Sequence, residues 1–351
     1  MTAPPRAPTI RDVAQAAGVS IGTVSKVLNK TGTIAPATRE KVAAVAAALN
    51  FRPNALAQSL HSGLSGAIGL ISNDSFGRFT MPIMEGLEGV LAPEGIGVFM
   101  CNATDDPLRE QAHIDQLLAK QIDGIVVTSR RSDHRPAVRM TGLGVPVIHA
   151  FSHSDDDQAL TLLPDDEGGA ALAVAHLVAG GRRRIAHVTG PRHFEAVALR
   201  QAGYAAALVQ AGLAALPVLN GPWSEASGRA AVAHLLLGAG PRPDAIFCGN
   251  DQIARGAADA LREAGMSVPG DIALVGFDNW NVMVGACRPP LTSVDMRLTA
   301  LGAEAGRRML RMIGGQDQHQ RGLERLPCDL VVRDSSAPRQ GFGGSILGET
   351  A

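Results

Sequence analysis

The sequence predicts a small all-α head of the helix-turn-helix type and a larger α/β body made of two doubly wound parallel-sheet subdomains. Three observations support this fold class. The chain has 351 residues, which is too long for one ordinary domain. Residues 9–49 show helical periodicity interrupted by a glycine turn. From residue 67 onward, short apolar runs alternate with helical segments, as in parallel sheets covered by helices.

Composition and processing signals exclude several classes of protein. Hydrophobic residues make up 46% of the chain and charged residues 19%, a globular rather than a disordered mixture. No apolar run reaches the roughly 18–20 residues of a membrane span, and residues 1–8 lack the pattern of a secretory signal. We therefore expect a cytoplasmic protein with no membrane partner and with free thiols at Cys101, Cys248, Cys287 and Cys328.

The charges are divided unevenly along the chain. Residues 1–63 contain seven Lys or Arg and two Asp or Glu, a net charge of +5. Of the chain's 32 basic and 33 acidic residues, 25 and 31 remain in the rest, a net charge of −6. A basic segment on an acidic body is typical of a DNA-binding head on a sensor, although ordinary surfaces also reach such values.

The first helix of the head begins at a capping box, in which Thr9 and Asp12 satisfy each other's backbone groups. Gly18 suits the left-handed conformation that ends this helix. A second helix is expected over residues 21–28 and a third over about residues 36–49. Two short helices joined by a glycine turn and followed by a third form a helix-turn-helix unit.

The second helix, capped by Ser20, presents small, polar or cationic side chains away from the predicted core. Such a face can approach the major groove, where hydroxyls reach phosphates and a lysine reaches guanine O6 and N7. The solvated face of a small protein-interaction module is the alternative. The outward residues are Ile21, Gly22, Thr23, Ser25 and Lys26.

Residues 52–60 predict one more short helix, which begins beside Pro53 and is too short to be stable alone. An exposed Leu60 is suited to act as an apolar wedge in a base step when two copies meet on DNA. This hinge shifts the balance of the two alternatives toward DNA binding.

Seven apolar runs in the body indicate buried strands, and six helical patterns lie between them. The series restarts after about residue 164, which predicts two similar subdomains that face each other across a ligand cleft at the carboxyl ends of their strands. The strands are expected at residues 67–71, 97–101, 124–128, 146–150, 185–189, 245–248 and 272–277. The helices are expected at residues 82–91, 108–120, 168–178, 197–210, 226–237 and 252–263.

Residues just after the predicted strands, and one tryptophan in a Gly-Pro-Trp-Ser loop, are candidates for ligand contacts. Carboxylates and amides bind the hydroxyls or amines of a ligand, while aromatic rings stack on its apolar face. The alternative for each Asn or Asp is to cap the following helix. The candidates are Asp74, Phe76, Phe79, Phe151, Trp223, Asn250 and Asp278.

The head contains four motifs: TIRDVA at residues 9–14, GVS at 18–20, TVSKVLN at 23–29 and PNALA at 53–57. Together they resemble the head of the LacI/GalR family of bacterial repressors. The resemblance implies that Ile21, Gly22 and Lys26 occupy base-reading positions, that Thr23 and Ser25 contact phosphates, and that Leu60 enters the minor groove. The DNA-binding set predicted on this basis is Thr9, Ser20, Ile21, Gly22, Thr23, Ser25, Lys26, Asn29, Asn54, Ala57 and Leu60.

The body resembles the periplasmic-binding-protein-like sensor of the same family. The resemblance rests on DDEG at residues 165–168, RQAGY at 200–204, GND at 249–251 and VGFDN at 275–279. It implies that an effector cleft is lined by Arg200, Trp223, Asn250 and Asp278.

Two departures from the family pattern affect the expected ligand. Ala198 is placed where the sugar-binding members have an arginine, and Phe151 where some have an aspartate. Both changes remove polar partners for sugar hydroxyls. Arg130, Arg192 or His193 are therefore candidates to supply charge for an acidic or heterocyclic ligand.

The expected organisation has four parts. They are a helix-turn-helix domain at residues 1–52, a hinge helix at 53–63, an effector-binding and dimerisation domain at 64–335, and a flexible tail at 336–351. Within the third part, we expect an N-subdomain at about 66–163 and 294–323 and a C-subdomain at about 164–292 and 324–335. The tail has no leucine heptads, so a homodimer is expected rather than a coiled-coil tetramer.

The leading hypothesis is a DNA-binding transcriptional regulator, expected to repress, whose affinity for a pseudo-palindromic operator is controlled by a sugar, sugar acid or similar metabolite. The alternative is a periplasmic-type solute-binding protein without a regulatory role. There is no Gly-x-Gly-x-x-Gly after a strand, no P-loop and no nucleophile elbow, and the ten histidines show no metal-ligand spacing. We therefore expect neither enzymatic activity nor a cofactor or metal.

Overall fold

A computed structural model describes residues 6, 8–28, 31–52, 63–133, 140, 142–154, 156, 159–238, 240–317 and 321–336. The chain forms two compact units, one of residues 1–67 with 119–123 and the other of residues 68–118 with 124–351. Asn29, the hinge residues Asn54, Ala57 and Leu60, and the predicted tail from residue 337 onward lie outside the described residues.

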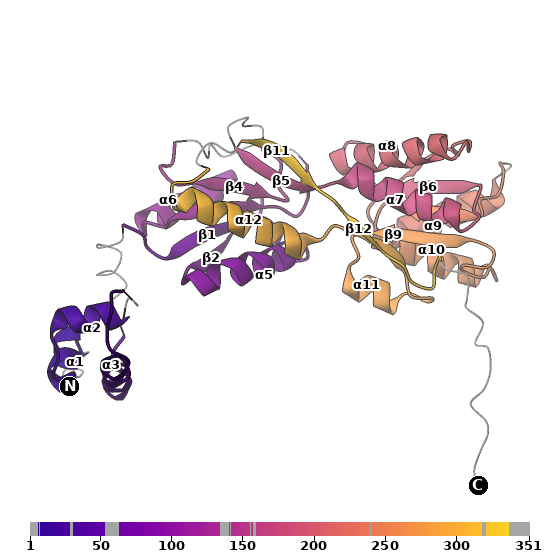
Figure 1. The fold of residues 1–351 in the computed structure, drawn as a ribbon. Helices are drawn as coiled ribbons and strands as arrows, with labels where there is room; N and C mark the ends of the chain where they lie inside the picture. The colour runs from indigo at the N-terminus through magenta and orange to yellow at the C-terminus, as the bar shows by residue number, and fades with distance from the viewer. Residues whose placement is uncertain are drawn as a thin grey trace, which may run out of the picture. The chain divides into compact units, whose positions relative to one another are not determined.

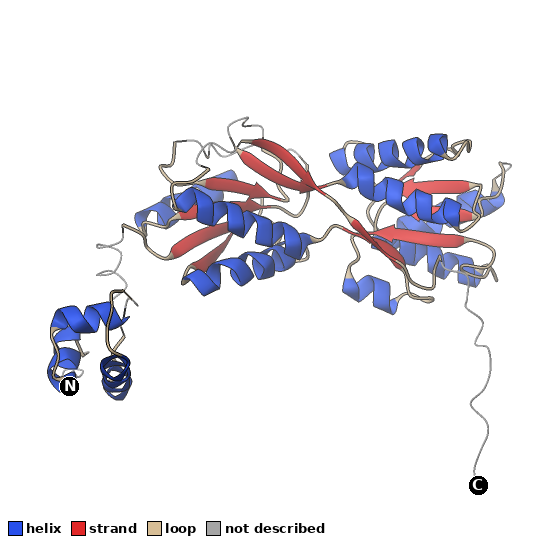
Figure 2. Ribbon diagram, in the orientation of Figure 1, coloured by secondary structure: helices blue, strands red, loops and turns tan. Residues whose placement is uncertain are grey.

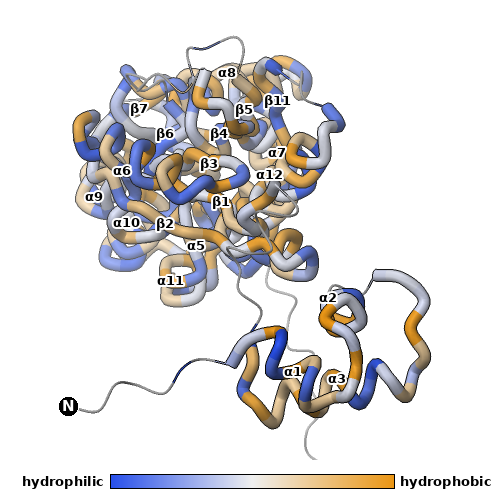
Figure 3. The backbone as a smooth tube through the Cα atoms, turned by 90° about the vertical axis from the view of Figure 1, so that its left-hand side faces the viewer, coloured by the Kyte–Doolittle hydropathy of each residue, from blue (hydrophilic) through white to orange (hydrophobic). Residues whose placement is uncertain are grey.

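The head consists of three helices, α1 (Ile10–Ala17), α2 (Ile21–Leu28) and α3 (Pro36–Ala48). Their shared core contains Val13, Val24 and Val42, all fully buried. Gly18 ends α1 with a φ of 63°, a left-handed conformation that glycine adopts without strain. The tube in Figure 3 shows that each helix carries hydrophobic and hydrophilic residues, as expected for helices that bury only one side. The predicted helix-turn-helix unit is confirmed.

Side chains at the helix starts form the predicted caps. The Asp12 carboxylate accepts hydrogen bonds from the Thr9 backbone N–H at 2.6 Å and from the Thr9 hydroxyl at 2.7 Å. At the start of α2, the Ser20 hydroxyl accepts from the Thr23 backbone N–H at 3.1 Å. Both caps satisfy backbone or hydroxyl groups that the helices leave unpaired.

The body has two lobes, each built on a six-stranded sheet (Figures 1 and 2). The sheet of the first lobe has the order β11-β5-β4-β3-β1-β2. Its strands are β1 (Ala67–Ser72), β2 (Gly97–Asn102), β3 (Gly124–Thr128), β4 (Val147–Ala150), β5 (Leu160–Pro164) and β11 (Gly322–Leu326). Its helices are α5 (Thr80–Leu91), the short 3₁₀ helix η1 (Ala92–Glu94), α6 (Pro107–Ala119) and α12 (Leu298–Ile313).

The second lobe repeats this plan with the sheet order β12-β10-β9-β8-β6-β7. Its strands are β6 (Ile185–Thr189), β7 (Leu219–Asn220), β8 (Ala245–Cys248), β9 (Ala273–Phe277), β10 (Thr292–Asp295) and β12 (Asp329–Val331). Its helices are α7 (Asp166–Ala179), α8 (Glu195–Gln210), α9 (Glu225–Leu237), α10 (Asp251–Glu263) and α11 (Asn281–Ala286). The two doubly wound subdomains predicted from the repeat are confirmed.

Burial separates the inner strands from one edge strand. Every residue of β3, β5, β6, β8 and β9 is buried, in agreement with their continuous apolar runs. The expected burial of residues 97–101 is wrong, because they belong to the edge strand β2, where Phe99 is 54% and Met100 is 50% exposed. An apolar run predicts a strand, but it does not reveal which strand ends the sheet.

The chain crosses between the lobes near its C-terminal end. Strand β10 still pairs with β9 in the second sheet, and β11 pairs in parallel with β5 in the first. The crossovers therefore fall slightly C-terminal to the positions expected at residues 294 and 324. All four cysteines are free thiols, and no helix in the described ranges is long and apolar enough to cross a bilayer.

Neighbouring helices of the body approach each other at glycines. A Cβ placed on Gly86 of α5 would lie 1.9 Å from the carbonyl oxygen of Thr299 in α12. Gly228 and Gly256 allow the same close approach between α9 and α10, and Gly203 allows it between α7 and α8. These helix pairs cover the sheets, so they fix the loops at the strand ends where a ligand is expected.

Candidate functional sites

The outer face of α2 carries five residues of the predicted DNA-binding set. Ile21 is 45% exposed, and Gly22 and Lys26 are also exposed, whereas Thr23 and Ser25 are half-buried. The buried residues of the same helix are Val24 and Val27, which fix this face outward. Thr9 and Ser20 lie at the helix starts in the caps described above.

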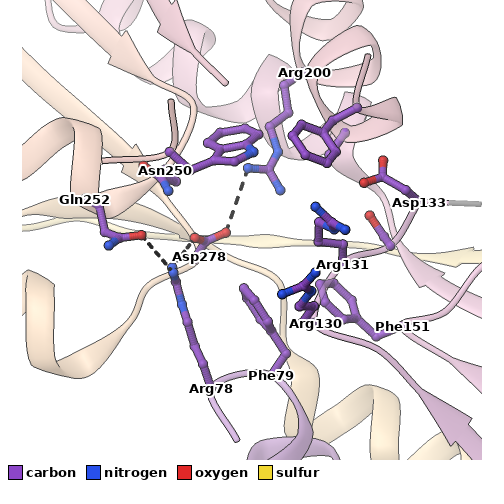
Figure 4. A pocket seen from close by; sticks show the side chains of 14 residues that line it. Arg78, Phe79, Arg130, Arg131, Asp133, Phe151, Arg200, Asn250, Gln252 and Asp278 are labelled. Atoms are coloured by element: carbon purple, nitrogen blue, oxygen red, sulfur yellow. Dashed lines mark hydrogen bonds and ion pairs between the residues drawn. The ribbon is translucent and has the colours of Figure 1, made fainter. Parts of the chain in front are cut away.

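The body contains a pocket of about 180 Å³ lined from both lobes (Figure 4). Six of the eight predicted effector-binding residues line this pocket, although they lie as many as 199 positions apart in the sequence. They are Phe79, Phe151, Arg200, Trp223, Asn250 and Asp278. The other lining residues are Arg78, Arg130, Arg131, Ser132, Asp133, Phe194, Ala196 and Gln252. Four of these six residues, Phe79, Phe151, Asn250 and Asp278, were selected because they follow predicted strands.

Asp74 and Phe76 are not among the lining residues of this pocket. The Asp74 carboxylate accepts hydrogen bonds from the backbone N–H groups of Phe79 at 2.8 Å and Thr80 at 3.1 Å, so it caps α5. Phe76 is 99% exposed and lines a broad groove on the surface. For Asp74, the capping alternative is confirmed.

A buried arginine organises the wall formed by the second lobe. Arg200 of α8 is 5% exposed, and its Nε donates to Asp166 at 2.7 Å. Its Nη1 donates to the Gly249 carbonyl oxygen and lies 3.8 Å from Asp278. Its guanidinium carbon lies 3.6 Å from the centre of the Phe277 ring. Because Arg200 is held on all these sides, it shapes the pocket as a fixed positive charge.

Arg78 connects the two lobes across the pocket. It comes from the first lobe, and its guanidinium pairs with Asp278 and donates to Gln252 at 3.3 Å, both in the second lobe (Figure 4). The same guanidinium stacks on Phe79 at 4.8 Å and on Trp280 at 4.3 Å. Burial raises the pKa of Asp278, while Arg78 and Arg200 oppose this effect.

Aromatic rings form two groups in the pocket. Phe79 and Phe151 from the first lobe have ring centres 4.9 Å apart. Phe194 and Trp223 from the second lobe have ring centres 6.1 Å apart. Arg131 reaches across from the first lobe, with its guanidinium carbon 4.9 Å from the Phe194 ring centre.

Asn250 combines a capping role with a position in the lining of the pocket. Its side-chain oxygen accepts from the Ile253 backbone N–H at 2.9 Å and so caps α10. The residue nevertheless lines the pocket. A capping role and a pocket position are therefore compatible at this strand end.

The sequence analysis did not select several residues of the pocket, although selecting the residues after every strand would have found some of them. Residues 130–133 follow β3, and Phe194 follows β6, so the same reasoning applied after those strands selects them. Of the three residues suggested as extra charges, only Arg130 lines the pocket. Arg192 and His193 are exposed, and Arg192 donates to Asn220 at 3.1 Å.

The substitution inferred at Ala198 does not affect this pocket. Ala198 is exposed on α8, and Ala196 is the alanine that lines the pocket instead. Phe151 does line the pocket, as the other inferred departure required. The expectation of a ligand other than a neutral sugar therefore depends on Phe151 and on the arginines, not on Ala198.

Comparisons with known proteins agree with this architecture. Residues 9–54 match the family described as bacterial regulatory proteins of the lacI family, and residues 174–336 match a periplasmic binding protein-like domain. The HTH-type transcriptional repressor PurR of Aliivibrio fischeri (strain ATCC 700601 / ES114) is 31% identical over 335 residues, which cover 94% of this chain and 99% of the relative.

Two solved structures extend the similarity to three dimensions. The lac repressor dimer bound to operator and the anti-inducer ONPF is similar with a TM-score of 0.75 and 30% identity, over 95% of this chain and 100% of that one. The complex of the transcriptional regulator CelR with cellobiose has a TM-score of 0.64 and 29% identity, over 93% of this chain and 99% of that one. Both proteins therefore share the order of head and two-lobed body.

Proposed function

Because the chain belongs to the lacI family of bacterial regulatory proteins, we propose that it is a transcriptional repressor whose affinity for operator DNA is controlled by a small molecule bound in the pocket. The lac repressor structure contains operator DNA, and the CelR structure contains cellobiose. These relatives support both halves of the proposal, since each is similar to this chain over more than nine-tenths of its length.

The observation that carries the proposal is a pocket lined from both lobes. Arg78 of the first lobe reaches Asp278 and Gln252 of the second, and Arg131 reaches Phe194. A ligand that exchanges contacts with these residues changes the relative free energies of the closed and open arrangements of the lobes. Such a change is the means by which ligand binding controls the DNA affinity of a repressor.

The head supplies the DNA-binding half. The exposed face of α2 presents Ile21, Gly22 and Lys26 without bulky acidic groups, and residues 1–63 have a net charge of +5. A helix of this kind reads base edges in the major groove while the charge attracts the phosphates.

We propose further that the protein acts as a homodimer on a pseudo-palindromic operator in the cytoplasm, with no catalytic role. Two copies of the head match two half-sites related by the same two-fold symmetry. The exposed apolar side chains of Phe99 and Met100 on the edge strand β2 are suited to an interface between copies. The cytoplasmic location follows from the DNA that the head would bind.

Gel-shift assays with DNA fragments from the genes around its own coding sequence test the proposal. Lys26→Ala is expected to weaken specific binding roughly tenfold or more, because a direct contact to a guanine contributes about 1–3 kcal/mol. The matched control is Lys120→Ala, which removes an exposed lysine after α6 and should leave binding unchanged.

Ligand binding without any sequence-specific shift would contradict the proposal. The protein would then be a solute-binding protein of the periplasmic type, whose pocket is used without a DNA-binding role. Equal losses for the Lys26 and Lys120 variants would show that α2 does not read the operator.

A further inference from the structure

Three of the hydrogen-bond acceptors that line the pocket already have partners in the protein. Asp278 is paired with Arg78 and with Arg200. The Asn250 oxygen caps α10. The Asp133 carboxylate accepts from the Glu195 backbone N–H at 2.7 Å. A neutral polyol needs acceptors for its hydroxyl protons, so this arrangement disfavours it.

A hydrogen-bond donor with a positive charge remains available. Within the part of the chain that the structure describes, the Arg131 guanidinium makes no hydrogen bond or ion pair. Asp133 also lines the pocket, and burial raises the pKa of its carboxyl, while the hydrogen bond from the Glu195 backbone and the charge of Arg131 oppose this effect. Arg130, in contrast, pairs with Asp105 at 2.6 Å. Figure 4 shows Arg130 and Arg131 between Asp133 and Asp278. The pocket therefore offers a cation to a ligand that brings its own acceptor.

The pocket also concentrates aromatic rings in a chain that has few of them. The whole sequence contains nine Phe, two Trp and one Tyr. Four of these twelve rings line the one pocket, in the pairs Phe79 with Phe151 and Phe194 with Trp223. Because one pair belongs to each lobe, a flat ring between the lobes can stack on both sides.

We propose that the ligand of this pocket is a planar aromatic or heteroaromatic carboxylate. Its carboxylate would accept hydrogen bonds from Arg131, and its ring would lie between the two aromatic pairs. This assignment rests on the proposed function only in that the pocket is taken as the effector site. It explains together the free arginine, the engaged acceptors and the four rings.

Isothermal titration of the full chain with four probes tests the ligand class. Benzoate carries both the charge and the flat ring, benzamide lacks the charge, cyclohexanecarboxylate lacks the flat ring, and D-ribose lacks both. Benzoate is expected to bind about tenfold or more tightly than each of the others, because it alone makes a charge-assisted hydrogen bond and stacks. Equal or tighter binding of benzamide or ribose would overturn the proposal, and so would an absence of benzoate binding.

A pair of variants tests the role of Arg131. Arg131→Gln is expected to weaken benzoate binding about tenfold while leaving benzamide binding unchanged, because only benzoate uses the charge. The matched control is Arg192→Gln, an exposed arginine beside the pocket loop whose loss should have no effect on either probe. Equal losses of both probes in the Arg131 variant would show a structural role and overturn the assignment.

Operator binding separates this proposal from the proposed function. The gel shift is measured on the unaltered chain, because Arg131 contacts Phe194 of the second lobe and its loss would itself change the balance between the arrangements of the lobes. If the unaltered chain gives the specific shift but benzoate fails to bind, only the ligand class is wrong. If no DNA fragment is shifted by the unaltered chain, the proposed function fails whatever the probes do.

Discussion

His187 is a histidine that the fold uses as a core aromatic ring. It is fully buried in β6, stacked on Phe247 at 4.6 Å and on Tyr204 at 5.2 Å between ring centres. Its Nδ1 lies 3.0 Å from the Phe247 carbonyl oxygen, to which it donates. Burial lowers the pKa of His187 from its ordinary value of 6.5 to about 4.

This depressed pKa predicts a stability change below neutral pH. As the pH falls from 6.5 toward 4, the unfolded chain gains a proton on His187 before the folded chain does. The contribution of the neutral ring is therefore present above pH 6.5 and lost across that window, by about 3 kcal/mol in total. Unfolding free energies measured across this range for the unaltered chain and for His187→Phe check the value.

The unfolding free energy of His187→Phe should lack that pH dependence. The variant has to be compared with the unaltered chain because the carboxyl of Asp251 changes the stability in the opposite direction with pH. Burial raises the pKa of Asp251 to about 8, so its contribution is lost as the pH rises toward that value. Only the difference between the two proteins isolates His187. His234→Phe, at an exposed position, is the control. Identical pH profiles for the unaltered chain and His187→Phe would rule out this account.

For single residues, the sequence predicts many of the side chains that line the pocket, but not which of them bind a helix backbone instead. Phe79, Phe151 and Asp278 were selected because they follow strands, and all three line the pocket. Asp74 was selected for the same reason, yet its carboxylate binds backbone N–H groups of α5. A carboxylate after a strand suits either role, and only the folded geometry separates them.

Helix pairing in the first lobe depends on a glycine that has no space for a side chain. Gly86→Ala is expected to destabilise the protein by about 1–3 kcal/mol, because the added methyl would overlap the Thr299 carbonyl and push α5 from α12. Gly89 lies in the same helix with nothing within 4 Å of an added Cβ. Gly89→Ala should therefore stabilise the protein by roughly 0.5–1 kcal/mol through helix propensity alone.

Urea denaturation of the two variants beside the unaltered chain measures both effects. Opposite signs are the expected result, since one substitution meets a neighbouring backbone and the other meets solvent. If Gly86→Ala were as stable as Gly89→Ala, the close approach of α5 and α12 would not exist in solution.

Helices and strands could be predicted wherever the sequence contained a long apolar run or a long helical pattern. The helices α5 to α10 and the strands β1, β3, β6 and β8 were located to within a few residues. The strands β5, β7, β10, β11 and β12 and the helices α11 and α12 were not identified. The strands β7, β11 and β12 are each short or partly exposed and alternate polar with apolar residues. Edge strands have one free side, so burial leaves little pattern in their sequence.

The uneven charge of the whole molecule predicts how its binding responds to salt. Residues 1–63 have a net charge of +5 and the remainder −6, so contacts with phosphates should come from the head. We expect operator affinity to fall about 10³-fold or more between 50 and 200 mM salt, as for proteins that make at least six phosphate contacts. Filter-binding or fluorescence titrations over that range give the slope of log affinity against log salt.

Arg183→Gln is the control for this prediction, because it removes an exposed charge from the second lobe. The salt slope of this variant should equal that of the unaltered chain. A reduced slope would mean that the body also touches DNA, and a flat response in the unaltered chain would contradict phosphate contacts by the head.

The whole architecture was predictable because the strand and helix pattern occurs twice in the body. The contact that joins the lobes was not, because Arg78 and Asp278 are 200 residues apart in sequence. Each of them is an ordinary charged residue in its own loop. Only the folding of both lobes makes them partners.

The bridge between Arg78 and Asp278 has a consequence for dose and response. Any molecule that uses Asp278 competes with an arginine of the same chain, which is present at a fixed and high effective concentration. The amount of metabolite needed for half-maximal response then depends on the strength of this internal competitor. In the proposed regulator, the strength of the contact between Arg78 and Asp278 would set how much of the metabolite is needed. A substitution at position 78 would then move the threshold concentration of the response.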